Sequence, residues 1–227
     1  MKNQLRKFHF TLVEVLIAMG ICVVGVVSIM GLFPVGANTS RDANMAFYAG
    51  QAAEQMLNFT RYAVLKDTSA SNVVFAALTG WGAGAVDNPG NAIFDSPADI
   101  AEPDDWSSVA QFDPENPNPT TAGLFGNLET SIMSMLINSD TEIKCYSLNA
   151  YRVALFTREL GGDSYEDFAC VVRLWATPIL VDETDTSSAK LPRSATFHAE
   201  VSWPADLPYV RRQKTEYTVD VFVPVGD

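Results

Sequence analysis

The segment from residue 10 to residue 35 has the sequence FTLVEVLIAMGICVVGVVSIMGLFPV. Its last 21 residues, Val15 to Val35, carry no charged side chain. A helix rises about 1.5 Å per residue, so a helix of this length spans the ~30 Å hydrocarbon core of a bilayer. The segment therefore predicts a transmembrane helix, which we place at residues 10–37.

The residues before this segment form a short basic leader, residues 1–9. It contains Lys2, Arg6 and Lys7, and no acidic residue precedes Glu14. Basic flanks stay on the cytoplasmic side of a membrane, which predicts that everything after the span lies on the far side. A secretory signal has a shorter apolar region, of about 7 to 15 residues, which argues against such a signal here. Cleavage after Ala37 is the alternative prediction.

Glu14 is the unusual residue of the apolar segment. It lies four residues after Phe10, and the next acidic side chain is that of Asp42. A carboxylate at the centre of a bilayer costs about 2.5 to 3.5 kcal/mol on insertion scales, and less near the interface, unless it finds a partner. One interpretation is that Glu14 reaches back to the cytoplasmic headgroups.

The residues Phe10-Thr11-Leu12-Val13-Glu14-Val15-Leu16, together with the basic leader, resemble the prepilin signal of type IV pilins and type II secretion pseudopilins. The resemblance covers about the first 40 residues. It implies that a prepilin peptidase cuts between His9 and Phe10 and that the new amine of Phe10 is methylated. It also implies that Glu14 of an incoming subunit pairs with that amine on a neighbouring subunit. The family normally has Gly where this chain has His9.

Beyond the apolar segment, an amphipathic helix over residues 38–66 is expected to continue the rod. Apolar residues recur there at helical spacing, namely Ala46, Ala49, Ala53, Met56, Leu57 and Val64. Pro34 lacks a backbone donor, which predicts a kink or local melting between Met30 and Pro34. Small residues allow close approach of neighbouring helices, and three glycines lie in the apolar segment, namely Gly20, Gly25 and Gly31. The alternative is that glycine is simply common in membrane helices.

Residues 67–143 form an acidic region rich in Gly, Pro, Asn and Asp, which predicts a long irregular loop with a short helix from Leu128 to Ile137. No Lys or Arg occurs between Lys66 and Lys144. Calcium prefers several oxygen ligands, so four neighbouring acids are candidate calcium ligands, although solvated acidic loops are commoner. They are Asp99, Glu102, Asp104 and Asp105.

Residues 144–227 are expected to form an antiparallel sheet of about four strands packed on the long helix, which makes the fold class α+β. The expected strands are Cys145–Arg158, Phe168–Ala176, Ala195–Trp203 and Thr215–Val223, with a hairpin turn at Gly161-Gly162. This register would place Cys170 opposite about Ala154, roughly 30 Å along the strand from Cys145. A disulfide between the two cysteines is therefore not expected.

The sequence offers little to an enzyme. It has two histidines, His9 and His198, and no nucleophile, zinc or phosphate-binding motif. The net charge of -12 disfavours nucleic-acid binding, because that affinity comes mainly from Lys and Arg. Five basic residues lie around the last two expected strands, namely Lys190, Arg193, Arg211, Arg212 and Lys214. They are interpreted either as a solvated edge of the sheet or as a patch that binds DNA.

These observations and the resemblance together predict a minor pilin or pseudopilin subunit without a catalytic site or cofactor. Its expected partners are other subunits of the filament, the prepilin peptidase, the inner-membrane assembly platform and the lipid bilayer. Its expected location is the bacterial inner membrane, with the C-terminal domain in the periplasm or on an external filament. The alternative is a single-span anchored binding protein that does not polymerise.

Overall fold

The computed structural model describes residues 11–66, 73–82, 87, 89–94, 96–109, 111, 141–147, 149–158, 164–182 and 189–223. They belong to two compact units, Met1–Ala46 (unit 1) and Phe47–Asp227 (unit 2). The long helix α1 (Leu12–Lys66) contributes residues to both units. The predicted helix from Leu128 to Ile137 and the predicted turn at Gly161-Gly162 lie outside the described residues.

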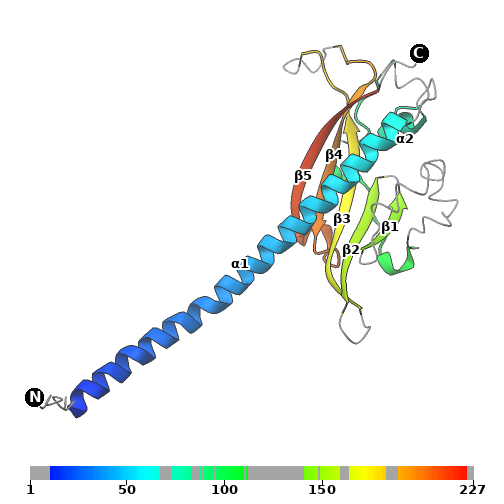
Figure 1. Cartoon of the computed structure of the whole chain (residues 1–227). Helices are drawn as coiled ribbons and strands as arrows, with labels where there is room; N and C mark the ends of the chain where they lie inside the picture. Colours follow the sequence, from blue (N-terminus) through cyan, green and yellow to red (C-terminus); the bar gives the residue numbers. More distant parts are fainter. Residues whose placement is uncertain are drawn as a thin grey trace, which may run out of the picture. The chain divides into compact units, whose positions relative to one another are not determined.

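Unit 2 contains a five-stranded antiparallel sheet in the order β1-β2-β3-β4-β5 (Figure 1). The order follows the chain, so each strand pairs with the strand next to it in sequence. The strands are β1 (Thr141–Ser147), β2 (Ala150–Arg158), β3 (Ser164–Thr177), β4 (Ser194–Trp203) and β5 (Gln213–Phe222). This sheet and the N-terminal helix confirm the predicted α+β class.

The sheet has one strand more than the expected number of about four, because the predicted strand Cys145–Arg158 is two strands. Asn149 lies in the turn between β1 and β2, where its backbone N–H donates to Ser147 Oγ at 3.3 Å. Its side-chain Nδ2 donates to the Leu174 carbonyl at 2.7 Å, and its own carbonyl accepts from Leu174 N at 2.9 Å. The two bonds to Leu174 hold the turn against β3.

The extra hairpin also corrects the geometry expected for the two cysteines. Cys145 lies opposite Tyr151 in β2, whereas Cys170 in β3 lies opposite Val153 rather than Ala154. The two residues are thus two strands apart across the sheet, not far apart along a single strand. Both are free thiols, and burial raises the pKa of each to about 12.

The C-terminal half of α1 covers one face of the sheet within unit 2 (Figure 1). Its buried face is made mainly of small residues, with Ala49, Ala53 and Ala63 fully buried and Met56 and Leu57 beside them. The Tyr48 ring lies 5.8 Å from the Phe168 ring of β3. The predicted apolar stripe is therefore confirmed for every residue except Ala46, which is exposed.

A short helix, α2 (Val73–Thr79), was not predicted and covers the same face near β4. Phe75 is fully buried there, and its ring meets the Phe197 ring edge-on at 6.3 Å between centroids. The apolar residues Phe197, Ala199 and Val201 of β4 are all buried on this face.

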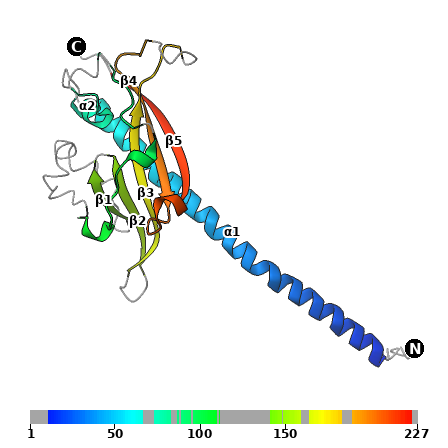
Figure 2. The same ribbon diagram turned by 180° about the vertical axis from the view of Figure 1, so that it is seen from behind.

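The opposite face of the sheet is covered by loops rather than helices (Figure 2). Two 3-10 turns, η1 (Pro97–Asp99) and η2 (Trp106–Ser108), belong to the segment that lies on it. Ile100 packs there against Ala150 and Trp175. A third turn, η3 (Tyr209–Arg211), lies between β4 and β5. Much of β3 and β4 is therefore buried on both faces, which explains why polar strand residues such as Ser202 are inaccessible to solvent, whereas β5 is mostly exposed.

Gly50 of α1 gives a test of how closely the helix approaches the sheet. A Cβ added at Gly50 would lie 3.2 Å from the hydroxyl oxygen of Tyr217 in β5. Replacing Gly by Ala inside a helix normally stabilises by about 0.5 to 1 kcal/mol. We expect Gly50→Ala to show this gain in a Tyr217→Phe background and to show less or none in the wild-type background. Urea denaturation of the four proteins in detergent gives the coupling energy. Equal effects in both backgrounds would contradict the contact.

Candidate functional site

The sequence singled out the start of α1, and the structure describes it from Thr11 onward. His9 and Phe10 lie outside the described residues, so cleavage before Phe10 and its methylation stay predictions. Glu14 lies in the first turn of α1 and is exposed. Its backbone N–H donates to Thr11 Oγ1 at 3.3 Å, and Val15 N donates to the Thr11 carbonyl at 3.2 Å. Thr11 therefore caps the helix.

This cap was missed in the sequence, although its signal was present. Thr11 and Glu14 have the spacing of a capping box, in which Ser or Thr is followed three residues later by Glu. A carboxylate in the first turn also interacts favourably with the positive end of the helix dipole. Glu14 thus has a local role in its own helix, separate from any role between subunits.

The apolar part of α1 is exposed along its whole length in unit 1. Its large apolar side chains are between 48% and 77% exposed from Leu12 to Val35. The hydroxyls of Ser28 and Thr39 are satisfied by the helix itself, because Ser28 Oγ donates to the Val24 carbonyl and Thr39 Oγ1 to the Val35 carbonyl. α1 is thus long and apolar enough to cross a membrane. Glu14 is the one ionisable acid or base from Thr11 to Ser40.

The predictions made for the glycines and for the proline of this helix have different outcomes. Within the described chain no atom other than the helix itself lies within 4 Å of a Cβ built at Gly20, Gly25 or Gly31, so their role in helix packing stays a prediction. Pro34 lies inside α1, and the residues before it are helical. The predicted local melting between Met30 and Pro34 is therefore wrong, whereas a kink at Pro34 stays a prediction.

The four candidate calcium ligands do not converge. Asp99 lies in η1 and Asp104 is exposed, while Asp105 caps η2 by accepting from Ser107 N at 2.8 Å. The hydrogen bonds from Ser107 lower the pKa of Asp105. Glu102 is occupied by two arginines. Among the described residues no three His, Cys, Asp or Glu side chains could hold a metal ion together.

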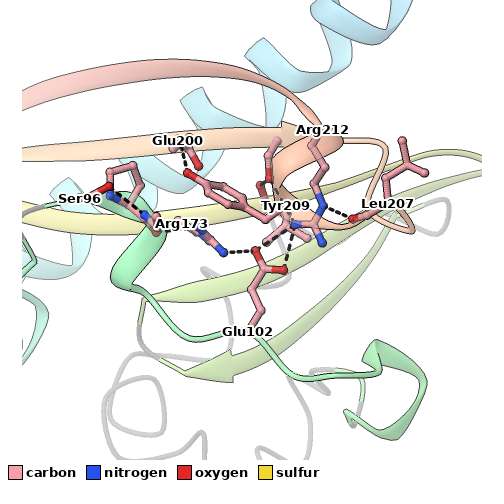
Figure 3. Close-up of polar contacts among 11 residues, drawn as sticks. Ser96, Glu102, Arg173, Glu200, Leu207, Tyr209 and Arg212 are labelled. Atoms are coloured by element: carbon pink, nitrogen blue, oxygen red, sulfur yellow. Dashed lines mark hydrogen bonds and ion pairs between the residues drawn. The ribbon is translucent and has the colours of Figure 1, made fainter.

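Glu102 is instead the centre of a buried ion cluster on the loop-covered face (Figure 3). Arg173 Nη2 of β3 lies 2.6 Å from one carboxylate oxygen, and Arg212 Nη1 lies 2.9 Å from the other. The side chains are nearly inaccessible, at 12% exposure for Glu102, 4% for Arg173 and 5% for Arg212. The single negative charge of Glu102 therefore balances only part of the positive charge of the two guanidinium groups.

The same arginines tie two loops to the sheet through backbone carbonyls. Arg173 Nη1 donates to the Pro97 carbonyl at 2.6 Å, and Arg212 Nε donates to the Leu207 carbonyl at 2.6 Å (Figure 3). Pro97 belongs to η1, and Leu207 belongs to the turn between β4 and β5. The cluster thus fastens both loops to the face of the sheet that α1 does not cover.

Tyr209 lies between two cations beside this cluster. The Arg173 guanidinium carbon is 3.8 Å from the centroid of the Tyr209 ring, and Lys214 Nζ is 3.6 Å from it. The Tyr209 hydroxyl donates to Glu200 Oε2 at 3.1 Å. Glu200 is 7% exposed, and its Oε1 has no hydrogen-bond partner in the described part of the chain. Burial raises the pKa of Glu200, and burial together with the charge of Glu200 raises the pKa of Tyr209.

A cleft of about 730 Å³ lies next to the ion cluster. Its charged lining residues are largely paired with each other, for example Arg152 with Glu166 at 2.7 Å and Lys144 with Glu142 at 3.3 Å. These pairs leave no unpaired cation of the described lining to attract an anion. The cleft is therefore explained as the space between the loops and the sheet, held open by ion pairs.

A second polar group lies on the same face, across β3, β4 and β5. Thr177 Oγ1 is 2.8 Å from His198 Nε2, and His198 Nδ1 is 2.8 Å from Glu216 Oε1. The His198 ring also stacks on Trp175 at 5.0 Å between centroids. The order hydroxyl, imidazole, carboxylate is that of a nucleophilic triad. However, neither described cleft is lined by any of the three residues.

The basic residues considered as a DNA patch are separated in the structure. Lys190 and Arg193 precede β4, whereas Arg212 and Lys214 lie at the start of β5. Ser194 pairs with Phe222 and Trp203 with Gln213, so the two groups lie at opposite ends of this strand pair, about 30 Å apart. Lys190 Nζ also donates to the Gly90 carbonyl at 2.8 Å, and Arg193 is paired with Asp87 at 3.0 Å. A single basic patch does not form.

Comparison of the chain with protein-family models, with characterised proteins and with solved structures finds no match.

Replacement of Glu102 should destabilise unit 2 strongly. Glu102→Gln leaves two buried guanidinium groups without a counter-charge, and loss of one partner of a buried ion pair costs about 3 to 5 kcal/mol. Asp87→Asn is the matched control, because Asp87 is 73% exposed where it pairs with Arg193. An exposed pair contributes less than about 1 kcal/mol. Urea denaturation of both variants measures the difference, and equal losses would show that the cluster does not hold the loops.

The raised pKa of Glu200 predicts how stability varies with pH. Because the folded chain holds the Glu200 proton more tightly than the unfolded chain does, the wild type gains stability from this residue as pH falls through its folded pKa. The gain is complete below the ordinary pKa of about 4.5. Glu200→Gln lacks this dependence, so its stability relative to wild type should rise between acidic and neutral pH.

Tyr209→Phe is the second variant of the Glu200 experiment. The hydrogen bond from Tyr209 lowers the pKa of Glu200, so its loss should move the stability change to higher pH. Denaturant midpoints measured across the pH range check both expectations. A constant difference between Glu200→Gln and wild type at every pH would contradict them.

Proposed function

We propose that the chain is a minor pilin or pseudopilin subunit, anchored by the first half of α1 and incorporated into a type IV pilus-like or type II secretion filament. The observation that carries the proposal is an exposed apolar helix with one carboxylate in its first turn, that of Glu14. The α+β unit that follows is compatible with this function, because it leaves the apolar half of α1 uncovered.

The proposed role of Glu14 follows from the electrostatics of a bilayer. Cleavage between His9 and Phe10 would create a positively charged amine close to Glu14 in the sequence. Pairing of Glu14 with the amine of a neighbouring subunit would neutralise two charges that lipid solvates poorly. The favoured partners are therefore other subunits of the same kind, supplied by a prepilin peptidase and an inner-membrane assembly platform. The C-terminal unit would lie in the periplasm or on an external filament.

A second candidate is a single-span anchored binding protein that does not polymerise. The place of Glu14 in the first turn of α1 favours it, because the interaction of a carboxylate with the helix dipole gives Glu14 a function within one chain. In this case the membrane form should begin at Met1. We propose a catalytic role for neither candidate.

Two variants separate these functions in cells that make filaments. If Glu14 pairs with a neighbouring amine, Glu14→Ala should lower incorporation into filaments at least about tenfold at an unchanged membrane level. Thr11→Val, which removes only the capping hydroxyl and costs about 1 kcal/mol of helix stability, should lower incorporation much less. If Glu14 acts only on its own helix dipole, Glu14→Ala should lower incorporation as little as Thr11→Val does.

N-terminal sequencing of the membrane form is the companion measurement. A filament subunit should begin at methylated Phe10. A chain that begins at Met1, combined with normal filaments in the Glu14→Ala strain, would overturn the proposed function.

A further inference from the structure

Within the described residues, β5 is an edge strand of the sheet. In the described part of the chain it pairs only with β4, and its ten residues contain neither Pro nor Gly. The pairing runs from Ser194 opposite Phe222 to Trp203 opposite Gln213 without a register shift. An edge strand presents every second N–H and C=O group to its surroundings, which makes it a template for another strand.

β5 lacks two of the usual devices that block such an edge, a proline and a register shift. Charged side chains often guard an edge, but those of β5 turn back over their own sheet. Lys214 lies over the Tyr209 ring, Glu216 is bonded to His198, and Asp220 Oδ1 accepts from Thr196 at 2.6 Å. The other edge differs, because β1 contains a register shift after Cys145 and is bridged by Gln111 at Lys144.

We propose that β5 accepts an extended strand from a different protein, about as long as β5 and with alternating apolar and basic residues. The side chains that face α1 are mostly apolar, and they are Thr215, Tyr217, Val219 and Val221. The other row carries Glu216 and Asp220, with Lys214 at its start. An antiparallel partner strand would therefore place apolar residues on the α1 side and basic residues opposite Glu216 and Asp220.

A second copy of this chain fits the edge poorly, an argument that rests on the membrane anchor of the proposed function. α1 enters unit 2 at the end of the sheet where β5 begins, since Tyr48 contacts Phe168 and Ala205 N donates to the Ala169 carbonyl there. Antiparallel pairing of two β5 strands would put these ends about 30 Å apart at opposite ends of the joint sheet. Both chains, however, would continue from there into one membrane.

Parallel pairing of two β5 strands is excluded by side-chain alternation. In a symmetric parallel pair, the twofold axis runs along the strands and places each residue opposite its own copy. The same rotation turns one sheet over, so the side that faces α1 in one copy is on the opposite face in the other copy. Paired residues in a sheet must point to the same face, so the two requirements conflict. A strand from another protein is under neither constraint.

Two peptides test the edge directly with the full chain in detergent. The first has the sequence Val-Lys-Val-Thr-Val-Lys-Thr-Glu, which runs antiparallel from Val221 to Lys214 with Lys opposite Asp220 and Glu216. The second exchanges Lys and Glu, giving Val-Glu-Val-Thr-Val-Glu-Thr-Lys. Fluorescence anisotropy of labelled peptides measures binding, and amide hydrogen exchange locates it. We expect saturable binding of the first peptide, at least about fivefold weaker binding of the second, and new protection confined to β5.

Proline variants at two neighbouring residues supply the structural control. Successive residues of a strand point their N–H groups to opposite sides of the strand. Of the variants Thr218→Pro and Val219→Pro, one therefore loses a hydrogen bond to β4. The other removes only an N–H group on the free edge, and we call it the edge-closing variant. The variant with the unchanged denaturation midpoint is the edge-closing one. It should bind the first peptide at least about tenfold more weakly than the wild type.

Several results would overturn the proposal. They are no binding of either peptide at millimolar concentration, equal binding by the edge-closing variant, and protection spread over the sheet. Sedimentation that shows a wild-type dimer lost in the edge-closing variant would make a second copy the occupant instead. These results are independent of filament incorporation in cells, so failure here and failure of the proposed function are distinguishable.

Discussion

The structure depends on one constraint, which is that a single helix must satisfy two surroundings. From Leu12 to Val35 α1 exposes large apolar side chains, and no described part of the chain covers them. From Ala49 to Val64 the same helix buries a face of small residues against the sheet. Small side chains let the backbone of α1 approach the strands closely, as the contact between Gly50 and Tyr217 shows. The first half has the length and apolar character of a membrane-crossing helix, whereas the second half packs within its own domain.

The other face of the sheet is held by charge rather than by apolar packing alone. Glu102, Arg173 and Arg212 come from a loop, a strand and a turn, and their ion pairs are almost inaccessible to water. A buried pair contributes little net stability, but the loss of one member is costly. The cluster therefore specifies where the loops lie, and it uses a carboxylate that the sequence offered as a metal ligand.

Sequence reasoning worked where one periodicity dominated over a long stretch. The α1 helix and the buried stripe around Ala53 follow from local spacing, and the structure confirms them. It failed where a local signal was short. The turn at Asn149 interrupts what otherwise reads as a single strand, and its stabilising bonds come from Leu174, which is distant in sequence. The spacing of Thr11 and Glu14 indicated a helix cap, but this short signal was overlooked beside the long apolar run that follows it.

The sequence by itself determined the class of the fold and the apolar character of its first helix, because both depend on the order of apolar and polar residues along the chain. The tertiary structure alone decided the partners of the charged residues. Glu102 was one of several equivalent acids in the sequence, and only the approach of Arg173 and Arg212 made it the centre of a cluster. The open edge of β5 likewise depends on strand order and on side chains that fold inward, which are long-range contacts that no local pattern encodes.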